Sequence, residues 1–230
     1  MLWFFQFFLS LTLLLPTLLA QTVSSNDCAS SVHVLLARGE GTGDDLNVLS
    51  TVQGLVLQQI PGSTVLGLPY DHGNSDKEAA AYNGSLLFQQ YVQQYAASCP
   101  NSKIALLGYS LGAVALMDGI CGTGSIGIYD YVAPLDPKYA DYVIGIFTYG
   151  DETYAPFQPW NVGNCTIGAG IFPRLNSGAC YPFQASLQSY CDYGDNQCCS
   201  PLPLDDNAAH HTYVEKYNQD VVNFIISRLG

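Results

Sequence analysis

The apolar positions of the chain form two kinds of segment, and the shorter kind predicts strands. Short, nearly continuous apolar runs rich in β-branched residues are typical of strands that are buried on both faces. Turn residues border these runs, as expected at the ends of strands. The predicted strands cover residues 31–38, 63–70, 103–110, 143–151 and 187–195.

Longer segments between these runs have apolar residues at helical spacing and predict helices. They cover residues 46–60, 78–99, 111–121 and 211–230. Strands that alternate with helices, and that are apolar throughout, predict a parallel sheet with helices on both faces. We therefore expect an α/β fold with three layers, an αβα sandwich around a central parallel sheet. The residues expected on the buried face of the second helix are Leu86, Leu87, Tyr91 and Val92.

The chain begins with an apolar stretch that has no charged residue before Asp27. Pro16 interrupts it and small residues close it, which is typical of a signal peptide; we expect residues 1–20 to be this signal, cleaved after Ala20. A membrane anchor is the alternative, because the run is nearly long enough to span a bilayer. Residues 21–230 then predict one soluble catalytic domain, which we expect to be monomeric and secreted.

The net charge of the chain is −12, with 19 acidic residues against 7 basic ones. Such an acidic surface repels nucleic-acid phosphates and anionic membranes. We therefore expect no nucleic-acid partner and no integral membrane association. The charge favours neutral partners, such as uncharged polysaccharide, polyester or lipid.

The cysteines predict disulfides rather than a metal site. An even number of cysteines in a secreted chain is typical of a disulfide framework, and no Cys-x-x-Cys pair is present. We expect neither a metal nor another cofactor. Asn83 and Asn164 begin glycosylation sequons, and the sequence leaves open whether they are modified. The eight cysteines are Cys28, Cys99, Cys121, Cys165, Cys180, Cys191, Cys198 and Cys199.

The motif "GYSLG" at residues 108–112 lies between a predicted strand and a predicted helix. A strand, a tight turn flanked by glycines and an immediate helix make up a nucleophile elbow, which exposes a serine at the carboxyl edge of a sheet. Gly108 and Gly112 allow the strand and the helix to approach closely. Ser110 is therefore the candidate nucleophile.

A serine nucleophile needs a base and an acid that orients the base. In this fold class the three residues occur along the chain in the order serine, acid, base. His33 lies inside the first strand, where we expect a hydrogen-bonded core role, and His72 precedes Ser110 in the chain. This leaves His210 and His211.

Several acidic residues lie between the serine and these histidines. Asp195 is the preferred acid, because it ends a predicted strand inside a loop bracketed by Cys191 and Cys198. The alternatives are ranked below it: Asp192, Asp151, and the loop residues Asp205 and Asp206.

Three segments together resemble one family over nearly the whole chain after residue 20. These are "GYSLGA", "SYCDYGDNQCC" and "HHTYVEKYNQDVVNFIISRLG", preceded by "VLLARG" near the start. They resemble the fungal cutinase and acetylxylan esterase family (carbohydrate esterase family 5), and "SYCDYGDNQCC" is closer to the acetylxylan esterase branch. The resemblance implies a cutinase-like α/β-hydrolase fold.

The resemblance also implies roles for individual residues. A Cys-x-x-x-Asp-x-x-Cys pattern makes Asp195 the acid, and His-x-x-Tyr before the last helix makes His210 the base, with His211 second. The resemblance implies two donors to the oxyanion: the backbone N–H of Leu111 and the residue at position 40, which in this chain is Glu40. The implied disulfides are Cys28–Cys99, Cys121–Cys180, Cys165–Cys199 and Cys191–Cys198.

Two residues depart from the pattern of that family. Leu111 stands where the family has Gln, but only its N–H is needed, whereas the carboxylate of Glu40 would oppose a developing oxyanion. Three alternatives stay open: Glu40 turns away and uses only its N–H, the hydroxyl of Thr42 serves instead, or the enzyme is weak.

The segment 152–186 is rich in glycine, proline and aromatic residues. It predicts either a loop packed beneath disulfides or a wall of the substrate cleft, since long ordered loops are often functional. Its aromatic residues include Tyr154, Phe157, Trp160 and Phe172.

We therefore expect a secreted serine esterase that forms an acyl-enzyme on Ser110. Its expected substrate is acetylated xylan or a related plant cell-wall polysaccharide, and cutin is the alternative. An alternative of another class, motivated by Glu40, is a weakly active or non-catalytic cell-wall-binding protein on the same fold.

Overall fold

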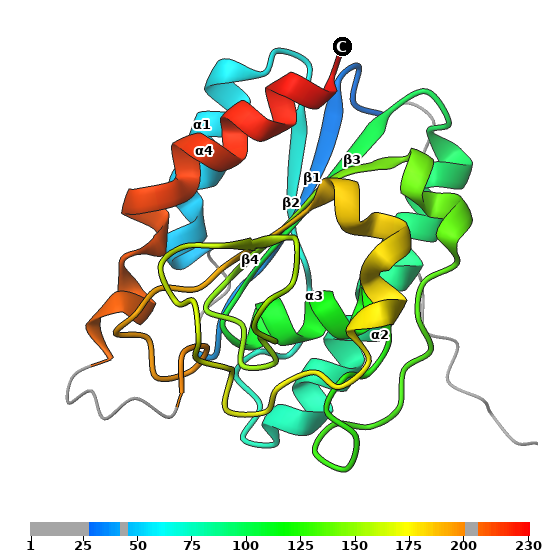
Figure 1. Ribbon diagram of the computed structural model, residues 1–230. Coiled ribbons are helices and arrows are strands. Elements are labelled where there is room, and N and C mark those ends of the chain that lie inside the picture. Colours follow the sequence, from blue (N-terminus) through cyan, green and yellow to red (C-terminus); the bar gives the residue numbers. More distant parts are fainter. Residues whose placement is uncertain (1–27, 42–45, 201–206) are drawn as a thin grey trace, which may run out of the picture.

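The computed structural model describes residues 28–41, 46–200 and 207–230, and its centre is a six-stranded parallel sheet with the strand order β2-β1-β3-β4-β6-β5 (Figure 1). The predicted signal peptide lies outside these residues. The strands are β1 (Val32–Ala37), β2 (Thr64–Gly67), β3 (Lys103–Tyr109), β4 (Val143–Tyr149), β5 (Asn161–Val162) and β6 (Leu187–Tyr190).

Helices cover both faces of the sheet, which confirms the predicted three-layer α/β fold. Helices α1 (Ser50–Gln59) and α4 (Tyr213–Arg228) lie side by side on one face, and α2 (Lys77–Ser98) and α3 (Leu111–Cys121) pack together on the other (Figure 1). Within the described residues, no helix combines the length and the apolar content that crossing a membrane requires. The remaining elements are short 3-10 segments at Asn47–Leu49, Pro137–Asp141, Ser177–Ser186 and Ala208–His211.

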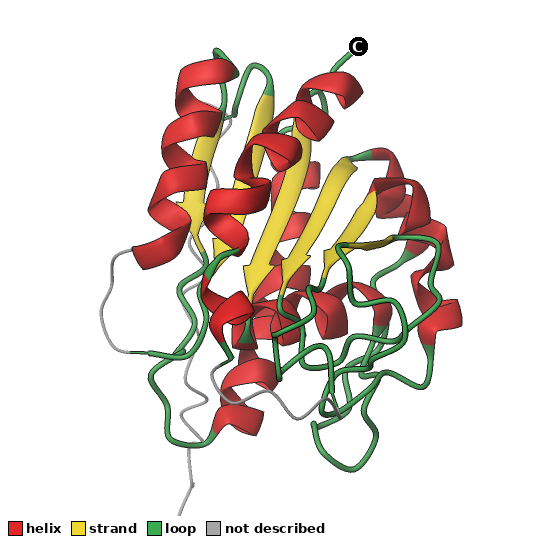
Figure 2. Cartoon of the chain, turned by 60° about the vertical axis from the view of Figure 1, so that its left-hand side comes forward, coloured by secondary structure: helices red, strands yellow, loops and turns green. Residues whose placement is uncertain are grey.

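The carboxyl ends of the strands all meet at one edge of the sheet, because every strand pairing is parallel. Figure 2 shows most of the loops gathered at this edge. Strand β3 lies in the interior of the sheet, between β1 and β4, so the residue that follows it reaches the middle of that edge. Ser110 is this residue.

The buried face of α2 agrees with the prediction at Val92, which is buried, and at Leu87 and Tyr91, which are partly buried against the core, but not at Leu86. Leu86 is 41% exposed, whereas Gly84, Ser85 and Phe88 are buried. The reason is the close packing of α2 on α3: a Cβ on Gly84 would lie 2.9 Å from the Ala115 Cβ. The prediction rested on large apolar side chains and so missed the small residues at this contact.

The last predicted strand is shorter than expected. Strand β6 ends at Tyr190, and Asp195 lies in the turn that follows rather than at a strand end. Gly194 has φ +100°, a left-handed backbone that leaves the extended conformation of a strand.

His33 has the core role predicted for it. Its Nδ1 lies 2.6 Å from the Thr64 hydroxyl, and its ring stacks on Tyr95 with 4.2 Å between the ring centroids. Burial lowers the pKa of His33 to about 4, because the charged imidazolium loses its hydration inside the protein.

This pKa predicts a pH-dependent contribution to stability. Between about pH 6.5 and pH 4 the unfolded chain binds a proton at His33 that the folded chain does not. The free energy of unfolding therefore falls as the pH drops through this window, by up to about 3 kcal/mol from this residue. Chemical denaturation of the wild type and of His33→Gln at several pH values measures the difference; parallel curves for the two proteins would contradict the assignment.

Candidate active site

Ser110 stands at a strained junction between β3 and α3. Its backbone has φ 53° and ψ −122°, a conformation that a residue with a side chain rarely adopts. The glycines on either side make this junction possible. A Cβ on Gly112 would lie 2.3 Å from the Ala37 carbonyl oxygen, and a Cβ on Gly108 would lie 2.3 Å from the Gly112 carbonyl oxygen. The sequence Gly-x-Ser-x-Gly thus folds as a nucleophile elbow.

A continuous chain of hydrogen bonds joins Ser110, His210 and Asp195. The Nε2 atom of His210 lies 3.0 Å from Ser110 Oγ, and its Nδ1 atom lies 2.9 Å from Asp195 Oδ2. His210 comes from the 3-10 segment before α4, and Asp195 comes from the turn after β6. The structure therefore brings together the three predicted residues with the contacts of a serine–base–acid triad.

The carboxylate of Asp195 is fully buried and accepts hydrogen bonds at both oxygens. The hydroxyl of Tyr213 donates to Oδ2 at 2.7 Å, beside the His210 contact. The backbone N–H groups of Gln197 and Cys198 donate to Oδ1 at 2.8 and 3.3 Å. These donors fix the orientation of the carboxylate toward the imidazole.

The sequence did not reveal the role of Tyr213, although it lies in the His-x-x-Tyr motif. Burial, and then the negative charge of Asp195, raise the pKa of Tyr213 well above its usual range, so the phenol keeps its proton. The hydroxyl also accepts the N–H of Asp192 at 3.0 Å. Tyr213 thus ties α4 to the loop that carries the acid.

Two further residues that support His210 were missed in the sequence. The hydroxyl of Tyr109 donates to the His210 carbonyl at 3.0 Å, and its ring lies 5.1 Å from the imidazole between centroids. Gly150, directly after β4, has φ 60° and leaves space for His210 and Asp195 to meet. A Cβ on Gly150 would lie 2.7 Å from His210 Nδ1 and 2.8 Å from Asp195 Oδ2. A lone glycine at the end of a strand gave the only signal for this close approach.

The alternative acids have other partners. Asp192 accepts hydrogen bonds from Lys216 Nζ at 2.7 Å and from the Tyr217 hydroxyl at 2.9 Å. Asp151 is buried and accepts two hydrogen bonds from Thr153, and burial raises the pKa of its carboxyl group. Asp205 and Asp206 lie outside the described residues. His211 contacts the Tyr109 hydroxyl through Nδ1 at 3.3 Å.

The two candidate oxyanion donors come from the start of α3 and from the loop after β1. Leu111 is the first residue of α3, where backbone N–H groups have no partner within the helix. The carboxylate of Glu40 lies 2.6 Å from the ammonium group of Lys77, at the start of α2. This ion pair gives the Glu40 side chain a cationic partner, which favours the first of the three alternatives. Thr42 lies outside the described residues.

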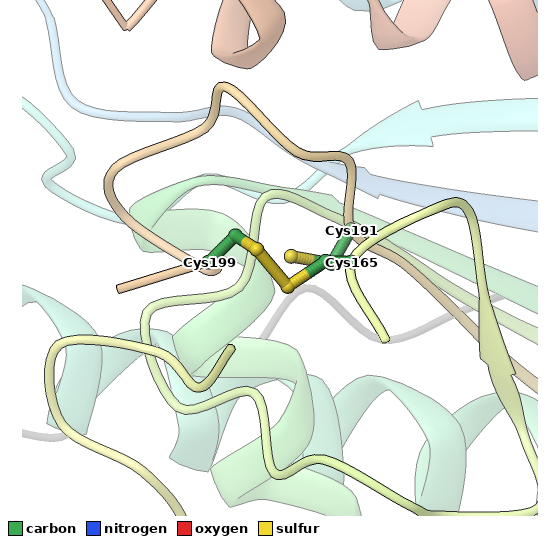
Figure 3. A group of neighbouring side chains, drawn as sticks. All are labelled: Cys165, Cys191 and Cys199. Atoms are coloured by element: carbon green, nitrogen blue, oxygen red, sulfur yellow. A yellow bond between two sulfur atoms is a disulfide. The ribbon is translucent and has the colours of Figure 1, made fainter. Parts of the chain in front are cut away.

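The structure contains four disulfides, and they join the pairs that the family resemblance implies: Cys28–Cys99, Cys121–Cys180, Cys165–Cys199 and Cys191–Cys198. Three sulfur atoms, those of Cys165, Cys191 and Cys199, lie within 4.8 Å of one another, a spacing that a metal ion would allow. Figure 3 shows the bond between Cys165 and Cys199. Sulfurs held in disulfides are not thiolates, the form that binds metals, so this cluster does not fit a metal.

A parallel sheet with a nucleophile elbow at its carboxyl edge defines the class of α/β-hydrolases. The family model described as Cutinase matches residues 28–229. "Cutinase 11" of Verticillium dahliae is 31% identical over 209 residues, which are 87% of this chain and 69% of that protein. "Acetylxylan esterase" of Hypocrea jecorina is 29% identical over 219 residues, which are 91% of this chain and 70% of that protein.

A solved structure agrees with these relatives. The catalytic core domain of acetyl xylan esterase from Trichoderma reesei superposes with a TM-score of 0.77 and 29% identity, over 88% of this chain and 99% of that one. The chain belongs to the cutinase family, and it is a carboxylic ester hydrolase.

The contacts of Gly150 predict that Gly150→Ala impairs the active site. The new methyl group would displace His210 or Asp195, and a displacement of about 1 Å at such a site can cost about 100-fold in rate. We expect kcat/KM for p-nitrophenyl acetate to fall by about that factor. Gly178→Ala is the matched control, because a Cβ at Gly178 meets no atom within 4 Å. Equal activity of the two variants would refute the contact.

The Glu40–Lys77 pair predicts opposite effects for two substitutions. Glu40→Thr adds a hydroxyl donor beside the backbone N–H, so we expect kcat to rise by about tenfold. Lys77→Met leaves the Glu40 carboxylate without this cation, so we expect kcat to fall. Steady-state kinetics with p-nitrophenyl acetate test both variants. Equal or lower turnover of Glu40→Thr would show that Glu40 does not obstruct the oxyanion site.

Proposed function

We propose that this cutinase-family esterase deacetylates xylan or a related neutral cell-wall polysaccharide, with Ser110 as nucleophile, His210 as base and Asp195 as the acid. The observation that carries the proposal is the unbroken chain of contacts from Ser110 Oγ through both ring nitrogens of His210 to the buried Asp195 carboxylate. A serine hydroxyl becomes a nucleophile when an oriented base takes its proton.

The proposed reaction has two halves. His210 takes the proton of Ser110 as the hydroxyl attacks the ester carbonyl, and Asp195 stabilises the imidazolium that forms. The imidazolium then protonates the leaving alcohol, and an acetyl-enzyme remains. Water, deprotonated by the same imidazole, releases acetate and restores Ser110. The N–H groups of Leu111 and Glu40 are the proposed donors to the oxyanion in both halves.

The choice of polysaccharide over polyester rests on similarity to a solved structure, whereas the net charge suits either uncharged polymer. The solved structure with a TM-score of 0.77 is an acetyl xylan esterase, whereas the curated relatives include both a cutinase and an acetylxylan esterase. A protein with a net charge of −12 suits an uncharged polymer and repels an acetate product. Cutin is the second candidate substrate, since one of those relatives is named a cutinase.

The four disulfides and the family indicate an extracellular protein. Secretion through the signal at residues 1–20 remains part of this proposal. The chain belongs to a family of carboxylic ester hydrolases, so we do not propose the non-catalytic alternative.

Ser110→Ala tests the proposed mechanism. Removal of the nucleophile of a serine hydrolase costs up to about 10⁶-fold in kcat, so we expect hydrolysis of p-nitrophenyl acetate to be lost. Ser227→Ala is the control, because the Ser227 hydroxyl lies near the end of α4 and donates to the Phe224 carbonyl. Retained turnover in Ser110→Ala would overturn the mechanism. Acetate release from acetylated xylan, compared with hydrolysis of cutin and of longer acyl esters, tests the substrate.

A further inference from the structure

A small pocket lies beside the edge strand β5, on the segment 152–166. It has a volume of about 180 Å³ and is lined by Tyr154, Phe157, Asn161, Gly163, Cys165 and Thr166. We call it the β5 pocket. The candidate mechanism uses none of these residues.

Phe157 is the unusual residue of the β5 pocket. Its side chain is 79% exposed, and its backbone has φ 62°, the left-handed region in which a bulky residue is strained. An exposed aromatic side chain alone needs no explanation. Core packing cannot offset the strain of a residue whose side chain is exposed. Backbone strain of this kind concentrates at functional sites. The conformation of Phe157 therefore points to a ligand that its ring contacts.

The polar groups of the β5 pocket suit hydroxyl groups rather than charges. The six lining residues are all uncharged. The amide of Asn161 donates through Nδ2 to the Ala155 carbonyl at 2.9 Å, while its Oδ1 has no hydrogen-bond partner among the described residues. Buried polar atoms without a partner are rare. Thr166 adds an exposed side chain with a hydroxyl group to the lining.

The β5 pocket adjoins the loop that carries Asp195. A Cβ on Gly163 would lie 2.3 Å from the Cys191 carbonyl oxygen, and the N–H of Cys165 donates to that same oxygen at 3.1 Å. In the sheet, β5 lies three strand positions from β3, which precedes Ser110. Three strand spacings are about 14 Å, a distance that a few linked sugar residues span.

We propose that the β5 pocket is a subsite that binds a neutral sugar ring of the polysaccharide substrate, with the Phe157 ring as the stacking platform. A sugar ring presents an apolar face of C–H groups, which packs on an aromatic ring, and hydroxyl groups at its rim, which bond to amide and hydroxyl groups. This inference rests on the proposed function: the subsite would hold the polymer while an acetyl group some residues away lies at Ser110.

Binding of xylotetraose to Ser110→Ala, followed by NMR or calorimetric titration, tests the subsite apart from catalysis. Adding Phe157→Gly should weaken binding about tenfold, the effect expected from losing one aromatic contact. Glycine accepts φ 62° without strain, so the thermal midpoint of this variant should stay equal or rise. Phe157→Tyr keeps the ring and should bind like the parent.

Tyr131→Ala is the matched control, because Tyr131 is a similarly exposed aromatic residue, 77% exposed, and does not line the β5 pocket. Thr166 belongs to the Asn164 sequon, so all proteins are treated with an endoglycosidase before titration. In the active enzyme, Phe157→Gly should lower kcat/KM about tenfold for acetylated xylan and leave p-nitrophenyl acetate unchanged.

Three results would overturn the subsite. These are undetectable binding of xylotetraose, equal binding by Phe157→Gly and its parent, and an equal loss of binding in Tyr131→Ala. A loss of activity in Phe157→Gly confined to longer acyl esters would show that the pocket holds acyl chains instead. Failure of the proposed function has a different signature: Ser110→Ala would keep its esterase activity, or wild type would not release acetate from xylan.

Discussion

The complete burial of one carboxylate, that of Asp195, determines how the rest of the candidate active site is built. A carboxylate without access to water is costly unless hydrogen bonds replace its hydration. Asp195 obtains them from three places in the chain: its own loop, the segment before α4, and α4 itself through Tyr213. The disulfide Cys191–Cys198 closes the loop around it. Asp195 thus contacts His210 through one of the hydrogen bonds that make its own burial possible.

The sequence predicted the parts of this arrangement that follow from local pattern. Apolar runs marked the strands, and Ser110 was recognisable because a glycine-flanked turn between a strand and a helix has few other uses. Contacts between distant segments were not predictable. Nothing near Gly150 in the chain indicates that an imidazole packs on it, and nothing near Glu40 indicates that Lys77 pairs with it. The face of α2 was predicted at Val92 but not at Gly84 and Ser85, because close helix packing brings in small residues that an apolar pattern does not mark.

The segment 152–186 joins the sheet edge to α3 through contacts that local pattern cannot supply. The buried guanidinium of Arg174 lies 2.5 Å from Asp118 of α3, and the disulfide Cys121–Cys180 ties the same helix to the segment. Burial raises the pKa of Asp118, which the charge of Arg174 opposes. A buried pair of this kind is costly to break from one side. These links hold a long segment of little regular structure in one place, as either predicted role of the segment, a packed loop or a wall of the cleft, would require.

Backbone strain in the described residues occurs both at the candidate active site and in the β5 pocket. Three non-glycine residues there have positive φ: Ser110, Asn207 and Phe157. Ser110 is the elbow. Asn207 begins the 3-10 segment that carries His210, and its side chain accepts the N–H of Asn196 in the Asp195 loop at 2.6 Å. Two of the three strained residues therefore lie at or next to the hydrogen-bond chain of Ser110, His210 and Asp195. Strain persists where surrounding contacts impose it, and the side chain of Phe157 is largely exposed, so core packing does not account for its conformation. The proposed sugar subsite gives that conformation a reason, because a ring held out of the core is free to stack on a ligand.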